Sequence, residues 1–386
     1  MLIKSNERIR GAELNLLAGK RAKQASAFAA AQKYLETGLG LLEERDWETH
    51  YPLTFQLHFE HLECQYLCGY YVEAEELYQE LLKKVRSKLD RTQLHLVAIL
   101  FATKNDFDTK AIEVGLQGLR ELGHDLPAKP SMFYIVREVI KVKRLIKKIG
   151  IERIMELPPA TEEKVQAVLN LLAAISPCAY NNNEDLLFAI ALKICELSLR
   201  YGHFANSASG YMTLAMVSII RLKDFQTGIP LGKTALALAE RYGTPAEKYI
   251  VNFLYGAFFL PWLEHTRQGE VYLEKAREGS LVSRDFTYAG YAMTFSLVSK
   301  HFRGLPLPEL AEQIGAYFQF ASKVKDPYFP CFLTIYRQMI SNLQGLTSGP
   351  DSFSDDTFDE EGFIRGDTGY RIREKELFDY YLCKNQ

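Results

Sequence analysis

The sequence predicts an all-α protein in which antiparallel helix hairpins stack into an α-α superhelix. One pattern of apolar and small residues, at i, i+3, i+4, i+7, i+8 and i+11, begins at Ala31, Ala74, Ala111 and Leu231. This spacing marks one broad face of a helix with 3.6 residues per turn. No stretch alternates apolar and polar residues for long enough to indicate a sheet.

The pattern is clearest on either side of Gly69. An apolar helix ends at Leu67, Gly69 supplies a backbone that can turn, and Ala74 opens the next helix, with Gly69 and Tyr71 as structural positions of the repeat. The stretch therefore predicts a helix hairpin that pairs residues 47–67 with residues 72–85. The face of the second helix consists of Ala74, Leu77, Tyr78, Leu81, Leu82 and Val85.

The hairpin is repeated along the chain. Ala74 follows Ala31 by 43 residues and Ala111 follows Ala74 by 37, close to the ~34-residue period of tetratricopeptide repeats with short insertions. Ala235 lies in the fourth occurrence, within residues 227–242. Because one helix pair cannot bury its apolar face alone, neighbouring pairs must stack. We therefore expect a tetratricopeptide-like superhelix with a concave groove.

Four segments follow from the pattern: regular hairpins in 1–123, divergent helical repeats that continue the same solenoid in 124–346, an exposed acidic loop in 347–369, and the first helix of an incomplete further repeat in 370–386. Thr244-Pro245 and Asp326-Pro327 each place a capping residue before a proline that starts a helix. The helices expected are 7–19, 24–42, 47–67, 72–85, 91–104, 109–122, 131–149, 162–176, 184–201, 206–222, 227–242, 245–263, 268–278, 286–302, 310–324, 327–346 and 370–382.

Composition narrows the functional classes. The 46 basic and 48 acidic side chains leave a formal charge of −2, so no global field attracts nucleic acid. The most hydrophobic stretch, 249–263, is shorter than the ~20 residues that span a bilayer. Six scattered cysteines are typical of buried thiols in a reducing compartment, and we expect a cytoplasmic protein without nucleic-acid binding or a membrane span.

Two motifs invite a chemical interpretation. Gly228 to Thr234 ends in Gly-Lys-Thr, but only three residues separate Gly228 from Gly232 and no strand precedes them, so a helix surface is favoured over a phosphate-binding loop. His61, Cys64 and Cys68 share a helix face and are a weak candidate for a zinc site. The same face carries apolar residues, which favours buried thiols and a core histidine.

Two charged stretches have plainer interpretations. The basic residues of 141–148 form a face that either contacts an acidic partner or a membrane surface, or is simply solvated, which is the favoured alternative. The acidic segment 351–361 lacks the spacing of a calcium loop. No local motif places a nucleophile, a base and an orienting group, so we expect neither an enzyme nor a cofactor.

Several stretches together resemble one family, the helical-repeat region of very large signalling proteins of bacteria and fungi. In that family a protein-kinase-like segment and an AAA-type or signal-transduction ATPase come first, followed by this helical region and often by a GAF domain and a histidine kinase. The resemblance implies a connector and sensor arm, and a fragment of a longer protein. It rests on Ala12–Lys20, Ala29–Leu39, Asp46–Phe55, Leu199–Ala208, Gly228–Leu236 and Phe259–Trp262.

Two functions are therefore expected from the sequence. The first is a non-catalytic scaffold whose groove binds a protein partner or a neighbouring domain of the same polypeptide, using inner helices such as 47–67. The alternative is a helical domain that senses a small molecule in a pocket around Tyr249 to Trp262. A ligand that raises the melting temperature separates the alternative from the first function.

Overall fold

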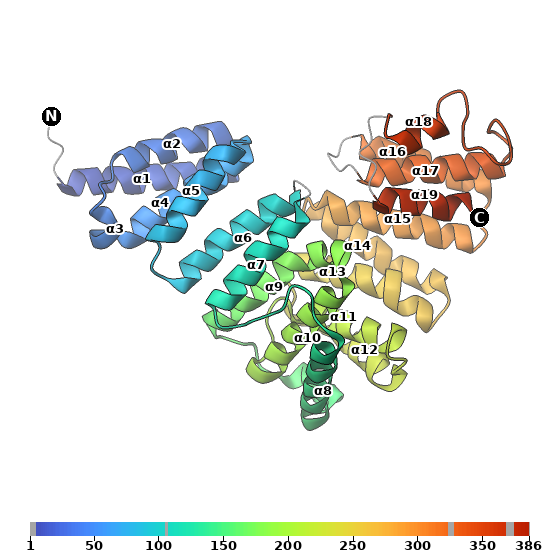
Figure 1. Ribbon diagram of the computed structural model, residues 1–386, viewed down its shortest axis with the longest axis horizontal. Coiled ribbons are helices and arrows are strands. Elements are labelled where there is room, and N and C mark those ends of the chain that lie inside the picture. Colours follow the sequence, from blue (N-terminus) through green and yellow to red (C-terminus); the bar gives the residue numbers. More distant parts are fainter. Residues whose placement is uncertain (1–4, 105–106, 323–327, 368–373, 386) are drawn as a thin grey trace. The chain divides into compact units, whose positions relative to one another are not determined.

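The computed structural model describes residues 5–104, 107–322, 328–367 and 374–385. These residues form helices connected by short bends, and Figure 1 shows no strand among them. The contacts of β type within the described ranges are three isolated bridges, for example Pro159 with His203. The all-α prediction is confirmed.

The chain divides into two compact units, and the predicted boundary after residue 123 falls inside the first. That unit comprises Met1–Val139 and Thr161–Ile190, and the second comprises Ile140–Ala160 and Ala191–Gln386. The helices of the first unit are α1 (Ser5–Gln24), α2 (Phe28–Gly40), α3 (Asp46–Thr49), α4 (Tyr51–Cys68), α5 (Tyr71–Lys84), α6 (Lys88–Lys104), α7 (Asp108–Glu121) and α9 (Glu163–Asn182).

Two helices, α8 (Met132–Ile149) and α10 (Glu184–Tyr201), run across the division. The second unit continues with η1 (Ile151–Glu156), α11 (Ser207–Ile220), α12 (Phe225–Tyr242), α13 (Pro245–Leu254), a π-helical turn η2 (Tyr255–Phe259), η3 (Leu260–Trp262), η4 (Thr266–Gly269), α14 (Glu270–Val282), α15 (Phe286–Phe302), α16 (Leu307–Ala321), α17 (Tyr328–Leu343), α18 (Glu360–Arg365) and α19 (Glu374–Lys384).

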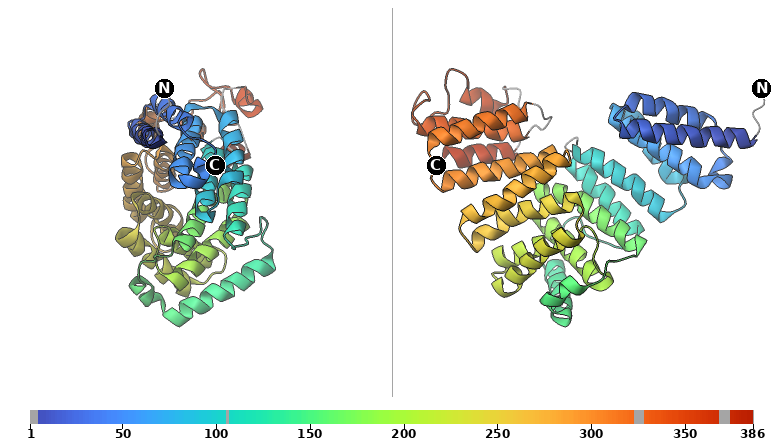
Figure 2. Two further views of the ribbon diagram at one scale, coloured as in Figure 1. Left: turned by 90° about the vertical axis from the view of Figure 1, so that its left-hand side faces the viewer. Right: turned by 180° about the vertical axis from the view of Figure 1, so that it is seen from behind.

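Consecutive helices pack against each other as hairpins within each unit. Examples are α1 with α2, α4 with α5 and α6 with α7 in the first unit, and α11 with α12 and α16 with α17 in the second (Figures 1 and 2). The bend between α4 and α5 forms where it was predicted. There Gly69 adopts the left-handed conformation at φ 86°, which a glycine reaches at no steric cost.

The small residues of the repeated pattern lie where helices approach closely. Ala31, Ala74, Ala111 and Ala235 are all fully buried. Gly115 on α7 faces α9 so closely that an added Cβ would lie 2.3 Å from the Cγ2 atom of Ile175. The pattern therefore selects small side chains because the neighbouring helix occupies the space a larger one would need.

The inner helix α4 is largely enclosed rather than open to a groove. It packs against α1, α2, α3, α5 and α6, and buries residues that include Phe55, Leu57 and Leu62. Its buried Glu60 forms ion pairs with Lys20 and Lys23 of α1. The side chains of α4 thus serve mainly the interior of the first unit.

The segment predicted as an exposed acidic loop, 347–369, differs from that expectation. Its described part contains α18 and buries Phe353, Phe358 and Phe363 in the core around α17 and α19. The carboxylate of Glu360 accepts a hydrogen bond of 2.9 Å from the backbone N–H of Phe353 and one of 2.5 Å from the hydroxyl of Tyr380. The burial of these three phenylalanines therefore outweighs the acidic composition and gives the segment a folded structure.

One further difference concerns the end of a helix. The helix expected through residue 263 leaves α-helical geometry at Tyr255, where a π-helical turn begins, and a 3₁₀ turn that contains Pro261 and Trp262 follows it. Thr244 caps α13 as predicted, since its hydroxyl accepts a hydrogen bond from the N–H of Glu247 at 3.2 Å. The second predicted cap, Asp326-Pro327, lies outside the described residues.

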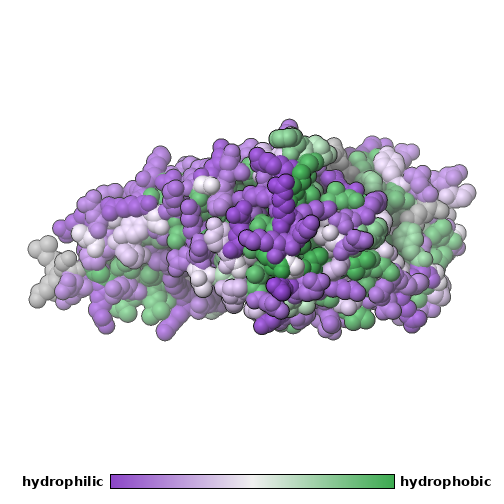
Figure 3. Space-filling model, turned by 90° about the horizontal axis from the view of Figure 1, so that it is seen from below, coloured by the Kyte–Doolittle hydropathy of each residue, from purple (hydrophilic) through white to green (hydrophobic). Residues whose placement is uncertain are grey.

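Within the described ranges, no helix combines the length and the apolar character needed to cross a lipid bilayer. On the face seen in Figure 3, hydrophilic side chains predominate and hydrophobic ones form scattered patches between them.

Candidate functional site

The bends of two neighbouring hairpins in the first unit expose large apolar side chains. The α4–α5 bend and the start of α7 carry them, and a 2.7 Å ion pair between Glu75 of α5 and Lys110 of α7 joins the two helix starts. Large contiguous apolar patches on a monomeric protein mark interaction sites. We call this surface the aromatic edge; its residues and exposed fractions are Leu67 37%, Tyr70 48%, Tyr71 50%, Val72 70% and Phe107 62%.

Local structure explains why these side chains point outward. The left-handed turn at Gly69 ends α4, so Tyr70 lies at the N-cap of α5 and Tyr71 at its first position, before its buried face begins at Ala74. One turn beyond Ala74, the hydroxyl of Tyr78 is buried and lies 2.7 Å from Nδ1 of His95. The buried face therefore fixes α5, and its first turn remains available for contacts.

The weak zinc candidate consists of side chains with different surroundings. Cys64 lies in an apolar cluster with Ala31 and Leu57, and burial raises the pKa of its thiol to about 11. Nε2 of His61 lies 3.7 Å from Oε1 of Glu36. Because metals bind the thiolate, a raised pKa disfavours Cys64 as a ligand. Among the described residues, no group of three His, Cys, Asp or Glu side chains has a metal-binding arrangement.

The two glycines of the Gly-Lys-Thr motif serve helix packing. Both lie inside α12, and a Cβ at Gly232 would be 2.2 Å from the Cζ atom of Phe259. The basic face of 141–148 is partly neutralised, since Lys141 pairs with Glu196 at 2.8 Å and Lys143 with Asp224 at 2.6 Å. Neither feature forms a binding site by itself.

The stretch from Tyr249 to Trp262, where a small-molecule pocket was expected, is mostly filled by its own aromatic side chains. Tyr249, Phe253 and Phe259 are buried. The ring of Phe253 lies 5.4 Å from that of Phe295 and 5.8 Å from that of Tyr288, both on α15. These edge-to-face contacts are typical of a packed core.

A cleft of about 400 Å³ opens just beyond this stretch, within the second unit. We call it the basic cleft. It lies between η4, the start of α14 and the bend that joins α15 to α16, where Gly304 takes the left-handed conformation at φ 77°. Its lining residues are His265, Arg267, Glu270, Lys300, Arg303, Gly304, Leu305 and Pro306.

The charges of the basic cleft are not balanced. Arg267, Lys300 and Arg303 bring three positive charges and Glu270 a single negative charge. Nη2 of Arg303 donates to Oε1 of Glu270 at 2.5 Å, and Nζ of Lys300 donates to the neutral amide oxygen of Gln313 at 3.2 Å. The cleft therefore combines an open volume with an excess of positive charge.

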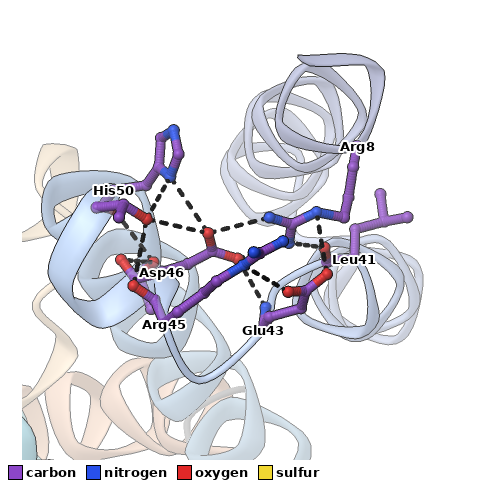
Figure 4. A network of polar contacts seen from close by, with 8 residues as sticks. Arg8, Leu41, Glu43, Arg45, Asp46 and His50 are labelled. Atoms are coloured by element: carbon purple, nitrogen blue, oxygen red, sulfur yellow. Dashed lines mark hydrogen bonds and ion pairs between the residues drawn. The ribbon is translucent and has the colours of Figure 1, made fainter. Parts of the chain in front are cut away.

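A second arginine–carboxylate cluster, in the first unit, is closed (Figure 4). Asp46 at the start of α3 is 1% exposed. Its carboxylate accepts two hydrogen bonds from Arg8 of α1, at 2.5 and 3.0 Å, and one from the backbone N–H of Glu43 at 2.7 Å. Arg8 also donates to the carbonyl of Leu41 at 2.6 Å, and Nδ1 of His50 lies 3.2 Å from Asp46.

This network ties α1 to the segment between α2 and α4. The hydrogen bonds from Arg8, and that from the backbone of Glu43, hold the pKa of Asp46 well below its usual range. Every oxygen of the carboxylate is occupied by protein donors, which leaves no room for a ligand. The network is a structural tie.

Sequence reasoning did not find the basic cleft. Its basic side chains come from two short connections, one around 265–270 and the other around 300–306, some 30 residues apart in the chain. Each connection alone looks like an ordinary solvated turn. The basic side chains come together only because α14 and α15 pack side by side, and no periodic pattern in the sequence predicts that contact.

Comparison with known proteins gives one informative similarity. No family model matches the chain, and no solved structure matches it. The chain is 24% identical over 345 residues to a protein described as hybrid signal transduction histidine kinase G, from Dictyostelium discoideum. The match covers 81% of this chain but 10% of the other protein, so the chain spans about a tenth of that relative's length.

Proposed function

We propose that this chain is a non-catalytic interaction and sensor arm of a multidomain, cytoplasmic signal-transduction protein. The observation that carries the proposal is the similarity of most of the chain to a limited part of a hybrid histidine kinase. As part of such a protein, this helical segment would connect other domains of the same polypeptide. The succession of helix hairpins along the chain supports a tetratricopeptide-like superhelix as the architecture of the arm.

The aromatic edge is the surface that supports a protein-binding role. Interfaces are enriched in tyrosine and phenylalanine, because these side chains bury much apolar area and lose little conformational freedom. Tyr71, Val72 and Phe107 are each at least half exposed and sit on two neighbouring helix starts. The partner is a protein segment with an apolar face, either a separate protein or a neighbouring domain of the same polypeptide.

A photo-crosslinking experiment tests this role. A benzophenone amino acid replaces Tyr71 in one variant, Phe107 in a second and Val282 in a control, because Val282 is 86% exposed on α14 in the other unit. Each variant is expressed in cells in place of the natural protein and illuminated. Positions 71 and 107 should then crosslink to the same protein segment. The proposal would be refuted if positions 71 and 107 formed no crosslink to any protein segment, or only the crosslinks that the control also forms.

The double change Tyr71→Ser and Val72→Ser supplies the matching affinity test. Since neither side chain belongs to the core, the fold should be kept while the crosslinked segment loses affinity by at least about tenfold, the effect of removing an interface hot spot. The same double change must leave the melting temperature nearly unaltered.

A second function, the sensing of a small molecule, is favoured by a specific observation in the second unit. The basic cleft offers a volume of about 400 Å³ and an excess of positive charge. A thermal-shift screen distinguishes the two functions, because a small ligand stabilises the chain by mass action in the absence of any protein partner.

A further inference from the structure

Arg303 is held in place without being fully paired. Its side chain is 17% exposed, and Nη2 forms its ion pair with Glu270. Its Nε is buried and has no hydrogen-bond partner within the described ranges. A guanidinium group offers five N–H donors and satisfies a carboxylate best through two parallel bonds. Because Nε is enclosed and Glu270 takes one bond from Nη2, any donor capacity that Arg303 offers to a ligand lies on its terminal Nη groups.

The other cations of the cleft are also available. Arg267 is exposed, and no ion pair joins it to a described residue. Lys300 is half-buried, with the amide of Gln313 as its hydrogen-bond partner. The nearby carboxylate of Glu274 already pairs with Arg277, to whose Nε it binds at 2.8 Å. Two positive charges thus remain after Glu270 is counted against Arg303.

The volume of the cleft indicates the size of ligand that it can hold. A volume of about 400 Å³ lies at the lower end of the range for small-molecule sites. A small organic molecule fits within this volume. Leu305 and Pro306 are among the lining residues and supply apolar contacts for a carbon skeleton.

We propose that the basic cleft binds a small organic anion that carries either a phosphate group or at least two carboxylates. Arg303 and Arg267 bind its oxygens by charge-assisted hydrogen bonds, Lys300 adds a third positive charge, and Leu305 and Pro306 contact its carbon atoms. This inference stands on the cleft alone and is independent of whether the aromatic edge binds a protein.

Titration calorimetry on the full chain at low salt tests the proposal. The probes are glycerol phosphate for the phosphate class, citrate for the carboxylate class, and glycerol as the uncharged reference. The variants are Arg267→Gln, Lys300→Gln and the double change. The matched control is Lys275→Gln, which removes one positive charge from an exposed position of α14 outside the cleft.

We expect one of the two anions to bind the natural chain, while glycerol does not. Each cleft variant should weaken that binding by about tenfold, the effect of losing one charge-assisted contact, and the control by less than about twofold. Binding of glycerol phosphate or of citrate assigns the class. The proposal is overturned if neither anion binds, or if Lys275→Gln weakens binding as much as Arg267→Gln does. Circular dichroism of each variant establishes that the fold is kept.

Discussion

Arg8 and Arg303 each pair with a carboxylate, but the two pairs have opposite surroundings. Arg8 meets Asp46 through two hydrogen bonds, and both partners are enclosed by backbone and side-chain groups of α1, α3 and the α2–α3 connection. Arg303 meets Glu270 through a single nitrogen at the wall of an open cleft that also holds two more cations.

The difference separates a structural tie from a binding site made of the same residue types. In the closed cluster, negative and positive charges are matched and protein donors occupy the carboxylate. In the cleft, positive charge exceeds negative charge and space remains for a ligand. The comparison therefore predicts that removing a carboxylate costs stability in the first case and changes ligand affinity in the second.

The largest effect is expected from Asp46→Asn. Asp46→Asn removes the main partner of Arg8 and leaves it only the carboxylate of Glu43, 3.7 Å from its Nε, so the free energy of unfolding should fall by about 3 kcal/mol, the lower end of the cost of breaking a buried pair. Urea denaturation measures the loss. Glu48→Gln is the control, since the Glu48 side chain on the same short helix is 76% exposed and should change stability by less than about 0.5 kcal/mol. An equal loss in both variants would show that Asp46 is not a special tie.

Asp46 also makes the stability of the fold depend on pH in the acid range. Because the folded-state pKa of Asp46 is lowered, its contribution is present above the unfolded pKa of about 3.9 and is lost as the pH falls through the folded pKa. Unfolding curves between pH 5 and pH 2 should show this loss in the natural chain and a shallower one in Asp46→Asn.

Glu247 sharpens the comparison, because it is a buried carboxylate without a cation. It is 4% exposed, accepts a 2.6 Å hydrogen bond from the N–H of Ser209, and burial raises its pKa to about 7. A raised pKa stabilises the fold below the unfolded pKa of about 4.3, and this contribution is lost as the pH rises through 7. Glu247→Gln should abolish that dependence and stabilise the chain by up to about 3 kcal/mol at pH 8.

Denaturant titrations at pH 5 and pH 8 measure the effect, with Glu278→Gln at an exposed position of α14 as the control. A natural chain whose stability does not fall between pH 5 and pH 8 would show that Glu247 is not held protonated by its surroundings.

A smaller effect on stability is expected when the cleft loses its carboxylate. Glu270→Gln removes the partner of Arg303, but Glu270 is 28% exposed and water reaches the cleft. The free energy of unfolding should therefore fall by about 1 kcal/mol or less, the usual worth of a partly exposed pair. Urea denaturation beside Asp46→Asn checks the contrast, and a loss of similar size in the two variants would remove the distinction between the clusters.

The smallest effect is expected from Arg267→Gln. Its side chain is exposed on η4 and joins no ion pair among the described residues, so stability should change by less than about 0.5 kcal/mol. Thermal unfolding measures this. A large loss of stability would indicate that Arg267 stabilises η4 and is not available to bind a ligand.

Periodicity predicted most helices because burial on one face repeats every 3.6 residues. Ala74 and Ala111 are fully buried as the pattern requires, and Gly69 turns as its lack of a Cβ allows. The bend between α1 and α2 was placed too early. There the chain turns at Ser26, with φ 60°, in a stretch that contains neither glycine nor proline, so the usual turn signals are missing.

Sites are harder to predict because they depend on contacts between distant segments. His61, Cys64 and Cys68 were singled out by their spacing on one helix, yet the environment of Cys64 is apolar. Arg303 and Arg267 were not singled out, since they meet only through the packing of α14, α15 and η4. The aromatic edge lies between these cases: the sequence indicated the bend at Gly69, and the structure adds the exposure of Tyr71 and Val72.

The anion affinity of Glu270→Gln tests the contrast between the two clusters most directly. This variant removes the carboxylate that competes for Arg303 while it keeps every cation of the cleft. Titration calorimetry with glycerol phosphate and with citrate should show tighter binding than in the natural chain, by about tenfold for the anion that binds. Unchanged or weaker binding would contradict the account, because it would mean that Arg303 does not face the ligand.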